Sequence, residues 1–338
     1  YGGQMINGYA AKERGARLEK FTYDPGELKD EEVEVKITHC GVCHSDLHLI
    51  NDFWKGYSTY PFIPGHEVIG EVAVAGKKVS SLKIGDRVGI GWQAGSCMNC
   101  EWCISGREHL CKSKTVTCVG RHGGFADFIR ADSRFAYLIP ENLGSENAAP
   151  LLCAGLTVFS PLKHHNISAA DRVGIVGIGG LGHLAIQFAK KFGCEVTAIS
   201  TTAGKEEEAR RFGAGRFLVS SDRPMMANAG ESLDYIISTI AAEADWNLYF
   251  NLLRPNGKLI IVGAAPGNFE IPVTAVIRTQ KTICGSATGG RADMREMLDF
   301  AARNNITAMT ETLPMRAANE AVEKVRSNKA RYRVVLKN

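Results

Sequence analysis

The pattern of apolar and polar residues divides the chain into two regions with different periodicity. From Met5 to about Pro150, short runs rich in Val, Ile and aromatic residues alternate with turns that contain glycine and proline. These runs are EVEVKIT, EVIGEVAVAG, GDRVGIGW, FADFIRA and FAYLIP. Short strands interrupted so often predict a mostly antiparallel, barrel-like region.

After Pro150 the repeating units become longer. The segment DRVGIVGIGGLGHLAIQFAKKFGCEVTAIST has the pattern of a strand, a glycine turn, an amphipathic helix and a second strand. KEEEARRFGAGRFLVSS, LDYIISTI and GKLIIVGAA continue this alternation, which is typical of parallel βαβ units. From about Thr288 the pattern returns to mixed helix and strand, and it ends in YRVVLKN. We therefore expect an α/β protein whose first domain comprises residues 5–154 and 288–338, and whose parallel-sheet domain comprises residues 155–287.

Composition and charge narrow the possible functions. The 338 residues include 40 basic and 36 acidic ones, and the net charge of +4 is too small and too evenly spread to indicate nucleic acid or an acidic membrane as partner. No apolar run is long enough to span a membrane. The first residues lack a signal pattern, and Tyr1 to Gln4, before Met5, are expected to be a cloning remnant. The cytoplasm is thus the expected location, where ten cysteines indicate metal ligands more than disulfides.

Four of these cysteines lie in the segment CMNCEWCISGREHLC, with gaps of two, two and seven residues. Such spacing lets four thiolates converge on one zinc ion and fill its tetrahedral shell, and a filled shell leaves no position for a substrate. We therefore predict a structural zinc site made by Cys97, Cys100, Cys103 and Cys111. The alternatives are two disulfides, free thiols, or a nucleic-acid-binding zinc module, for which Arg107, Lys112 and Lys114 are a weak basic patch.

A catalytic zinc needs three protein ligands and one open position. The segments CGVCHSDLH, PGHEVIGEV and LLCAGLTVF offer Cys43, His66 and Cys153. None of the three is specific alone, because a single buried Cys or His is usually a packing residue.

A glycine motif predicts the cofactor site. Gly177, Gly179 and Gly182 form G-x-G-x-x-G after an apolar strand and at the start of a helix, with Gly180 and Leu181 in the same turn. The three glycines permit a tight turn, the approach of a pyrophosphate and close helix packing, and the helix N-terminus favours the phosphates.

The segment after the second strand of this domain indicates which nicotinamide cofactor is used. An NAD site wants Asp or Glu about 20 residues after the first glycine, and no acid occurs between Thr197 and Gly204. Hydroxyls and a cation can instead hold a 2′-phosphate, which predicts a preference for NADPH. The residues that offer them are Ser200, Thr201, Thr202 and Lys205. The alternative is that Lys205 begins a solvated helix and contacts nothing.

Taken together, these segments resemble the zinc-dependent medium-chain alcohol dehydrogenases over nearly all of the chain from Met5. The segments HSDLH, GIGGLGH and KARYRVVL resemble most closely the branch of NADPH-dependent aldehyde reductases and cinnamyl-alcohol-dehydrogenase-like enzymes. The resemblance implies a GroES-like barrel-type catalytic domain and a Rossmann domain with a doubly wound parallel sheet. It also implies hydride transfer between NADPH and aliphatic or aromatic aldehydes, two zinc ions per chain, and a homodimer, with a homotetramer as the alternative.

The resemblance also assigns residues around the catalytic zinc. It selects Cys43 over Cys40 as the ligand beside His66 and Cys153. It implies that Asp46 holds the outer nitrogen of His66, and that Glu67 lies behind the zinc or binds it transiently. The leftover cysteines are then expected to pack as small apolar residues, and His164 and His165 to lie at the surface or at a helix end. These cysteines are Cys40, Cys118, Cys194 and Cys284.

The remaining implied residues bind substrate and cofactor or move a proton. The resemblance places Ser45 and a solvent-facing His48 in a proton relay, for which a hydroxyl and a near-neutral imidazole are suited. It places Thr157 near the nicotinamide, His44 near the pyrophosphate and Arg333 within reach of a phosphate. Trp54 and Trp92 are expected to line an apolar substrate cleft. The alternatives are a turn-capping Ser45 and tryptophans that belong to the barrel core.

Three other functions remain possible at this stage. An NAD⁺-linked alcohol oxidiser would want an acidic residue after the second cofactor strand. A zinc-free quinone reductase would lack the set of Cys43, His66 and Cys153. A purely structural zinc scaffold would not need the glycine motif.

Overall fold

The computed structural model describes residues 4–338. The expected remnant before Met5 therefore lies almost entirely outside the described residues. Contacts within the chain divide it into two compact units: unit 1 ends at Cys153 and resumes over Gly289–Asn338, and unit 2 comprises Ala154–Thr288. No helix among the described residues is long and apolar enough to cross a membrane.

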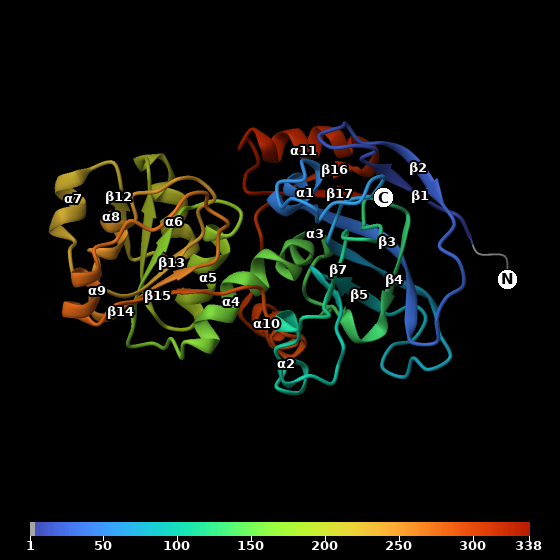
Figure 1. Cartoon of the computed structure of the whole chain (residues 1–338), viewed down its shortest axis with the longest axis horizontal. Helices are drawn as coiled ribbons and strands as arrows, with labels where there is room; N and C mark the ends of the chain where they lie inside the picture. The colour runs from blue at the N-terminus through green and yellow to red at the C-terminus, as the bar shows by residue number, and fades with distance from the viewer. Residues whose placement is uncertain (1–3) are drawn as a thin grey trace. The chain divides into compact units, whose positions relative to one another are not determined.

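Unit 1 is built mainly from antiparallel strands, as the short apolar runs predict (Figure 1). Its principal sheet has the order β16-β17-β3-β4-β5-β9, and β8 also pairs with β3. The two further pairs are β1 with β2 and β6 with β7. The strands are β1 Ile6–Ala10, β2 Glu19–Tyr23, β3 Glu32–Val42, β4 Glu67–Ala75, β5 Arg87–Ile90, β6 Gln93–Gly95, β7 Thr115–Val116, β8 Phe128–Asp132, β9 Ala136–Leu138, β16 Thr310–Pro314 and β17 Arg333–Lys337.

The long strand β3 holds this sheet together. Its first half pairs with β8, its second half pairs with β17, and its other edge pairs with β4 throughout. Most of β3 is buried, and its valines and isoleucine belong to a core that also contains Phe62 and Phe125. Beta-branched residues fit such a strand because their side chains pack well on a pleated surface.

The helices of unit 1 are few and mostly short. They are α1 His44–Ile50, α2 Glu101–Ile104, α3 Ser145–Ala148, α10 Arg291–Asn304 and α11 Ala318–Arg326, with 3₁₀ turns at Glu108–Leu110, Ser133–Phe135, Ala149–Leu152 and Met315–Ala317. In α10 the buried residues Met294, Met297, Leu298, Ala301 and Ala302 follow the i, i+3, i+4 spacing of a helix face packed on a core.

Unit 2 is a six-stranded parallel sheet with the order β12-β11-β10-β13-β14-β15 (Figure 1). The chain begins at β10, winds outward to β12, and returns to β13 on the other side of β10. This order is that of the Rossmann fold, and it places the binding crevice where the winding reverses. The elements are β10 Arg172–Val176, β11 Glu195–Ser200, β12 Arg216–Val219, β13 Leu233–Ser238, β14 Leu253–Ile261, β15 Thr282–Gly285, α4 Ala154–His164, α5 Gly182–Lys191, α6 Glu206–Phe212, α7 Arg223–Asn228, α8 Trp246–Phe250, α9 Val273–Thr279 and the 3₁₀ turn Ala203–Lys205.

Candidate active site

Three segments of unit 1 bring the predicted zinc ligands together. Cys43 is the N-cap residue of α1, His66 directly precedes β4, and Cys153 follows the 3₁₀ turn Ala149–Leu152. The Sγ atoms of Cys43 and Cys153 lie 4.0 Å apart. All three residues and Glu67 are buried, and one ligand atom from each lies within 4.8 Å of the others. The four side chains could therefore hold one metal ion.

Asp46 fixes the geometry of this cluster. One carboxylate oxygen, Oδ2, accepts the backbone N–H of Cys43 at 2.9 Å, which closes the first turn of α1. The other, Oδ1, accepts from the backbone N–H of Gly65 at 3.0 Å and from Nδ1 of His66 at 2.9 Å. With Nδ1 donating, Nε2 of His66 is the ring nitrogen left to bind a cation, either a proton or a metal ion.

That Nε2 atom is buried and has no hydrogen-bond partner among the described residues. Burial alone would lower the pKa of His66, but the charge of Asp46 and the neighbouring thiol of Cys153 raise it well above its ordinary value. The Cys153 thiol in turn lowers the pKa of Cys43. The pocket around Nε2 thus favours a positive charge.

Glu67 of this cluster also belongs to a buried ion pair. The Glu67 carboxylate accepts from the Arg333 guanidinium, and both side chains are almost fully buried. Burial raises the pKa of Glu67 to about 7, although Arg333 opposes the shift. Oε2 of Glu67 has no hydrogen-bond partner among residues 4–338. The structure thus gives Arg333 a carboxylate partner, and its expected contact with a phosphate stays a prediction.

The proposed relay residues lie on α1. His44 is exposed and Ser45 is half-buried, and no hydrogen bond of the Ser45 hydroxyl occurs within the described chain. The cap of α1 is made by Asp46, so the structure gives Ser45 no capping role. His48 is half-buried, which differs from the solvent-facing side chain expected from the sequence. Burial, with a smaller contribution from His44, lowers the pKa of His48.

Aromatic rings connect His48 to His66. The His48 ring stacks on the Phe53 ring, with 4.6 Å between the ring centroids. It also meets the Trp54 ring edge-on, with 4.9 Å between the centroids. The ring centroids of Trp54 and Trp92 lie 6.0 Å apart, and those of Trp92 and His66 lie 4.8 Å apart. Both tryptophans are only partly buried, so they form a wall beside the cluster as well as packing on the core. Phe53 was not predicted from the sequence, although its position next to Trp54 is a signal for it.

The four cysteines of the predicted structural zinc site also converge. They lie in residues 97–111, which we call the lobe. The Sγ distances are 3.8 Å for Cys97–Cys103, 3.6 Å for Cys100–Cys103 and 3.5 Å for Cys111–Cys97. A tetrahedral zinc with thiolates at about 2.3 Å needs sulfurs about 3.8 Å apart, whereas a disulfide needs about 2 Å. The cysteines are free, so the alternative of two disulfides is wrong. Backbone amides of Asn99 and Cys100 lower the pKa of Cys97 to about 6, which favours its thiolate form.

The glycine turn of unit 2 has the geometry that its motif requires. Gly177 has a φ of +88°, a left-handed conformation that favours glycine. A Cβ atom on Gly182 would lie 1.8 Å from the carbonyl oxygen of Gly177, so only glycine permits this packing. No atom lies within 4 Å of the space where a Cβ of Gly179 would be. Thr239, which no sequence motif indicates, donates from Oγ1 to the carbonyl oxygens of Val176 and Gly177.

The predicted 2′-phosphate residues surround the end of β11. Ser200 is the buried last residue of that strand, and Thr201 and Thr202 are exposed. Nζ of Lys205 donates to the carbonyl oxygen of Ile178 at 2.7 Å. The alternative that Lys205 contacts nothing is therefore wrong, because the side chain reaches the glycine turn. Thr157 is buried on α4 of the same unit.

The leftover cysteines differ in their surroundings. Cys40 and Cys194 are buried, as expected for packing residues. Cys118 is buried against the cluster, since its Sγ, Asp46 and His66 form a further close group. Burial raises its pKa to about 11, so it is a neutral thiol. His164 ends α4, and Nε2 of His165 lies 3.7 Å from Sγ of Cys284.

A groove of about 730 Å³ lies elsewhere in unit 1, between β1, β2, β16 and the end of β17. Within the described residues, none of the predicted catalytic or metal-binding side chains lines it. The chemistry of the site therefore belongs to the buried cluster rather than to this groove.

Comparison with known proteins identifies the family. Residues 29–141 match the family "Alcohol dehydrogenase GroES-like domain", and residues 180–303 match "Zinc-binding dehydrogenase". The chain is 43% identical to Aldehyde reductase AdhA of Synechocystis sp. over 98% of each chain. A cinnamyl alcohol dehydrogenase of Sorghum bicolor matches with a TM-score of 0.94 and 39% identity, over 99% of this chain and 98% of that chain. CAD from Helicobacter pylori, complexed with NADP(H), matches with a TM-score of 0.90 and 31% identity, over 98% of each chain.

The two family matches span much of the antiparallel unit and most of the parallel sheet, and the similarity to the aldehyde reductase covers 98% of the chain. It confirms the GroES-like and Rossmann parts of the fold that the resemblance implied. The chain therefore belongs to the medium-chain family of zinc-binding alcohol dehydrogenases, and it is an oxidoreductase that acts on alcohols or aldehydes.

Proposed function

We propose that the protein is a zinc-dependent, NADP(H)-linked aldehyde reductase that also oxidises primary alcohols. One observation carries this proposal: Cys43, Cys153 and His66 converge in a buried cluster in which Nε2 of His66 has no partner among residues 4–338. A buried imidazole nitrogen without a partner is costly unless a ligand satisfies it. Two sulfurs and one nitrogen are the ligand set of a catalytic zinc with an open position.

The donor set fits zinc in charge as well as in type. Two thiolates balance the charge of Zn²⁺, so the loaded cluster is neutral and suits a buried site. The carboxylate of Asp46 orients His66 and keeps Nε2 available. A second zinc would fill the Cys97, Cys100, Cys103 and Cys111 cluster and hold the lobe together.

The bound zinc would supply a Lewis acid that polarises the carbonyl of the substrate, and the reduced nicotinamide would supply the hydride. The residues of this chain do the rest. Trp54 and Trp92 present apolar surface to the substrate tail and limit access of water. The Ser45 hydroxyl both accepts and donates, so it can pass a proton toward the product oxygen, and His48 replaces that proton.

The preference for NADP(H) rests on the end of β11. A carboxylate there would bind a ribose hydroxyl and repel a 2′-phosphate, and none occurs from Thr197 to Gly204. Lys205 brings a cation to the glycine turn through its bond to the Ile178 carbonyl. The similar CAD from Helicobacter pylori, which is complexed with NADP(H), supports the same cofactor for this chain.

The test is a comparison of kcat/KM for NADPH and NADH on aliphatic and aromatic aldehydes, with the zinc content measured on the same sample. We expect NADPH to be preferred, and Lys205→Met to remove most of that preference while leaving activity with NADH. Lys191→Met, on the neighbouring helix α5, is the matched control and should change neither. Equal or better use of NADH by the unmodified enzyme would reject the cofactor assignment.

We also propose that the enzyme is a homodimer that uses the edge of unit 2. β15 is the last strand of the six-stranded sheet, and Val273 and Ile277 on the adjacent helix α9 are 71% and 68% exposed. An open strand edge beside exposed apolar residues is a common place for a second copy to pair. A homotetramer is the alternative, and a cytoplasmic location stays a prediction.

A further inference from the structure

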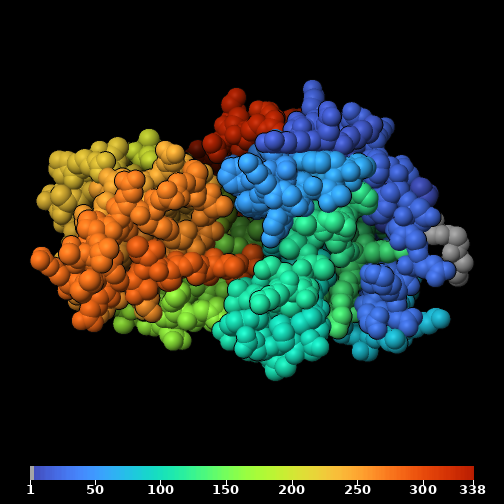
Figure 2. Space-filling model, viewed as in Figure 1, coloured from blue at the N-terminus to red at the C-terminus, as the bar shows by residue number. Residues whose placement is uncertain are grey.

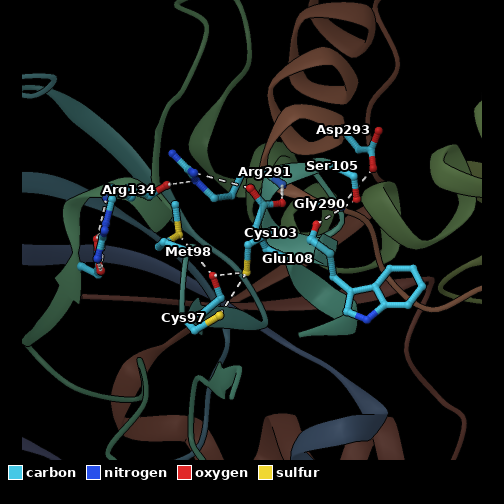
Figure 3. A network of polar contacts seen from close by, with 12 residues as sticks. Cys97, Met98, Cys103, Ser105, Glu108, Arg134, Gly290, Arg291 and Asp293 are labelled. Carbon is cyan, nitrogen blue, oxygen red and sulfur yellow. Dashed lines mark hydrogen bonds and ion pairs between the residues drawn. The ribbon is translucent and has the colours of Figure 1, made fainter. Parts of the chain in front are cut away.

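The cysteine lobe contacts helix α10 through one buried carboxylate. On the face seen in Figure 2, the lobe forms a rounded projection. Glu108 lies between the last two lobe cysteines and is only 3% exposed. Its Oε2 accepts the backbone N–H of Arg291, the first residue of α10, at 3.1 Å, and its Oε1 lies 3.4 Å from Nη1 of the same residue (Figure 3).

The neighbouring residues make this contact specific. Nε of Arg291 donates to the carbonyl oxygen of Arg134 at 3.0 Å, so the guanidinium is held from two sides. A Cβ atom on Gly290 would lie 1.9 Å from the carbonyl oxygen of Gly106 and 2.9 Å from Oε2 of Glu108. The lobe therefore presses directly on the start of α10, where only glycine fits.

One turn later the same helix lies beside Gly91, which is next to the catalytic site in the sequence. Met294 of α10 is buried, and a Cβ atom on Gly91 would lie 3.1 Å from its Cε and 2.7 Å from the carbonyl oxygen of Leu152. Leu152 directly precedes Cys153, and Gly91 directly precedes Trp92, whose ring contacts His66. Glu108 is thus linked to two members of the catalytic site through contacts within unit 1.

We propose that Glu108 and Arg291 are a positioning pair that couples the cysteine lobe to the Cys43–His66–Cys153 cluster. The proposal rests on the proposed zinc sites. When zinc is bound to the four lobe cysteines, the lobe holds the side chain of Glu108 in position. Glu108 then holds Arg291, and with it the first turn of α10, in place. Met294 then holds Gly91–Trp92 in place, and Gly91 in turn lies against the Leu152–Cys153 segment. Breaking the pair leaves a buried charge without its partner and frees the start of α10.

The test uses the zinc-loaded full chain with Glu108→Gln, Arg291→Met, Met294→Ala and the double variant Glu108→Gln/Met294→Ala. We measure kcat, the KM for NADPH and the rate at which a chromogenic chelator removes zinc. In a Cys43→Ser background the same assay follows the lobe zinc alone. We expect kcat to fall, and zinc loss from the catalytic cluster to accelerate, each by roughly 2- to 30-fold, with the KM for NADPH unchanged. The double variant should be no worse than the poorer single one, because both changes break one chain of contacts.

Two controls separate positioning from plain stabilisation. Arg107→Met removes a lobe cation that lies over Trp102 and has no described contact with α10, so it should change none of these rates. Arg291→Lys keeps the backbone N–H and the charge, and it should recover part of the loss if Arg291→Met fails to fold. Unchanged kcat and zinc loss in Glu108→Gln, or additive effects in the double variant, would overturn the proposal. An unmodified enzyme without zinc would instead reject the proposed function.

Discussion

At the scale of single residues, the site depends on which atoms lack partners. Asp46 uses both carboxylate oxygens on Cys43, Gly65 and His66, and so it leaves Nε2 of His66 as the free ligand atom. The same reasoning applies at the cofactor site, where the end of β11 offers hydroxyls and a lysine in place of an acid. Two residue-scale predictions follow from these atoms.

Ser200→Asp should move the cofactor preference toward NADH. The new carboxylate would accept from the ribose hydroxyl and repel a 2′-phosphate, and the change in the ratio of the two kcat/KM values should be at least about tenfold. Ser220→Asp is the control for adding a buried acid close to β11, because Ser220 directly follows the neighbouring strand β12. Retention of the original preference in Ser200→Asp would show that Ser200 lies away from the 2′ position.

His48→Ala should slow turnover and remove a pH dependence. Burial lowers the pKa of His48, so the neutral ring persists to a lower pH than for an ordinary histidine. In alcohol oxidation the neutral ring accepts the proton, and the rate should therefore fall as the pH drops through this lowered pKa. The variant should lose this acid limb, with cofactor affinity nearly unchanged. A wild-type rate at every pH would remove His48 from the relay.

At the scale of elements, backbone packing in short turns decides what each site tolerates. One region built on such a turn is strand β10 with the glycine turn and helix α5. The other region is the lobe around α2. In the glycine turn, a Cβ atom on Gly182 would collide with backbone, whereas a Cβ atom on Gly179 would lie in open space. In the lobe, the sulfurs of Cys97, Cys100, Cys103 and Cys111 all lie within 4.8 Å of one another.

The two motif glycines should respond differently to the same substitution. Gly182→Ala would place Cβ 1.8 Å from the Gly177 carbonyl, so the turn must move and the melting temperature should fall by several degrees. Gly179→Ala meets nothing within 4 Å, so the fold should be kept while the Kd for NADPH rises, because the added methyl occupies space near the pyrophosphate. Thermal melts and cofactor titrations check both outcomes. Equal loss of stability in the two variants would contradict this reasoning.

Removing one ligand from each cysteine-containing cluster should have unequal effects. Elemental analysis should find about two zinc ions per chain. Cys43→Ala should abolish turnover with little loss of fold, whereas Cys103→Ala should mainly destabilise the lobe, because metal binding there is coupled to folding. One zinc ion or none in the active enzyme would reject the two-site assignment.

At the scale of the whole molecule, the two units contain different candidate sites. Unit 1 contains both candidate metal clusters, and unit 2 contains the glycine turn and the open edge of β15. The exposed apolar residues of α9 belong to unit 2 as well.

Val273→Asp combined with Ile277→Asp should therefore shift the enzyme toward monomers. Charges at these positions oppose burial of the α9 surface against a second copy. Sedimentation velocity at several concentrations measures the change. Ile104→Asp, which alters an equally exposed apolar residue on the lobe, is the control and should leave the assembly state unchanged. A wild-type assembly state in the double variant would place the interface elsewhere.

The fold class could be predicted from the sequence because its periodicity is strong and local. The apolar strands of unit 2 alternate with amphipathic helices, and this spacing allows only parallel winding. In unit 1 the apolar pattern did not predict β1, β2, β6, β7 and β16. The exposed positions of β1 and β2 carry charged or polar residues, which weaken the apolar signal, and β6 and β7 are only three and two residues long. The parallel pairing of β16 with β17 also required the tertiary structure, since α11 makes the crossover between two short strands.

For the site, the sequence by itself determined the chemistry that can occur, because residue types and spacing are local properties. It specified the lobe cysteines, the glycine turn and the absence of an acid from Thr197 to Gly204. Only the tertiary structure decided the partners. It joined Arg333 to Glu67 across 266 positions, buried His48 among aromatic rings, and brought Glu108 to Arg291 across 183 positions. Such contacts depend on how distant strands and helices pack, and no local pattern encodes them.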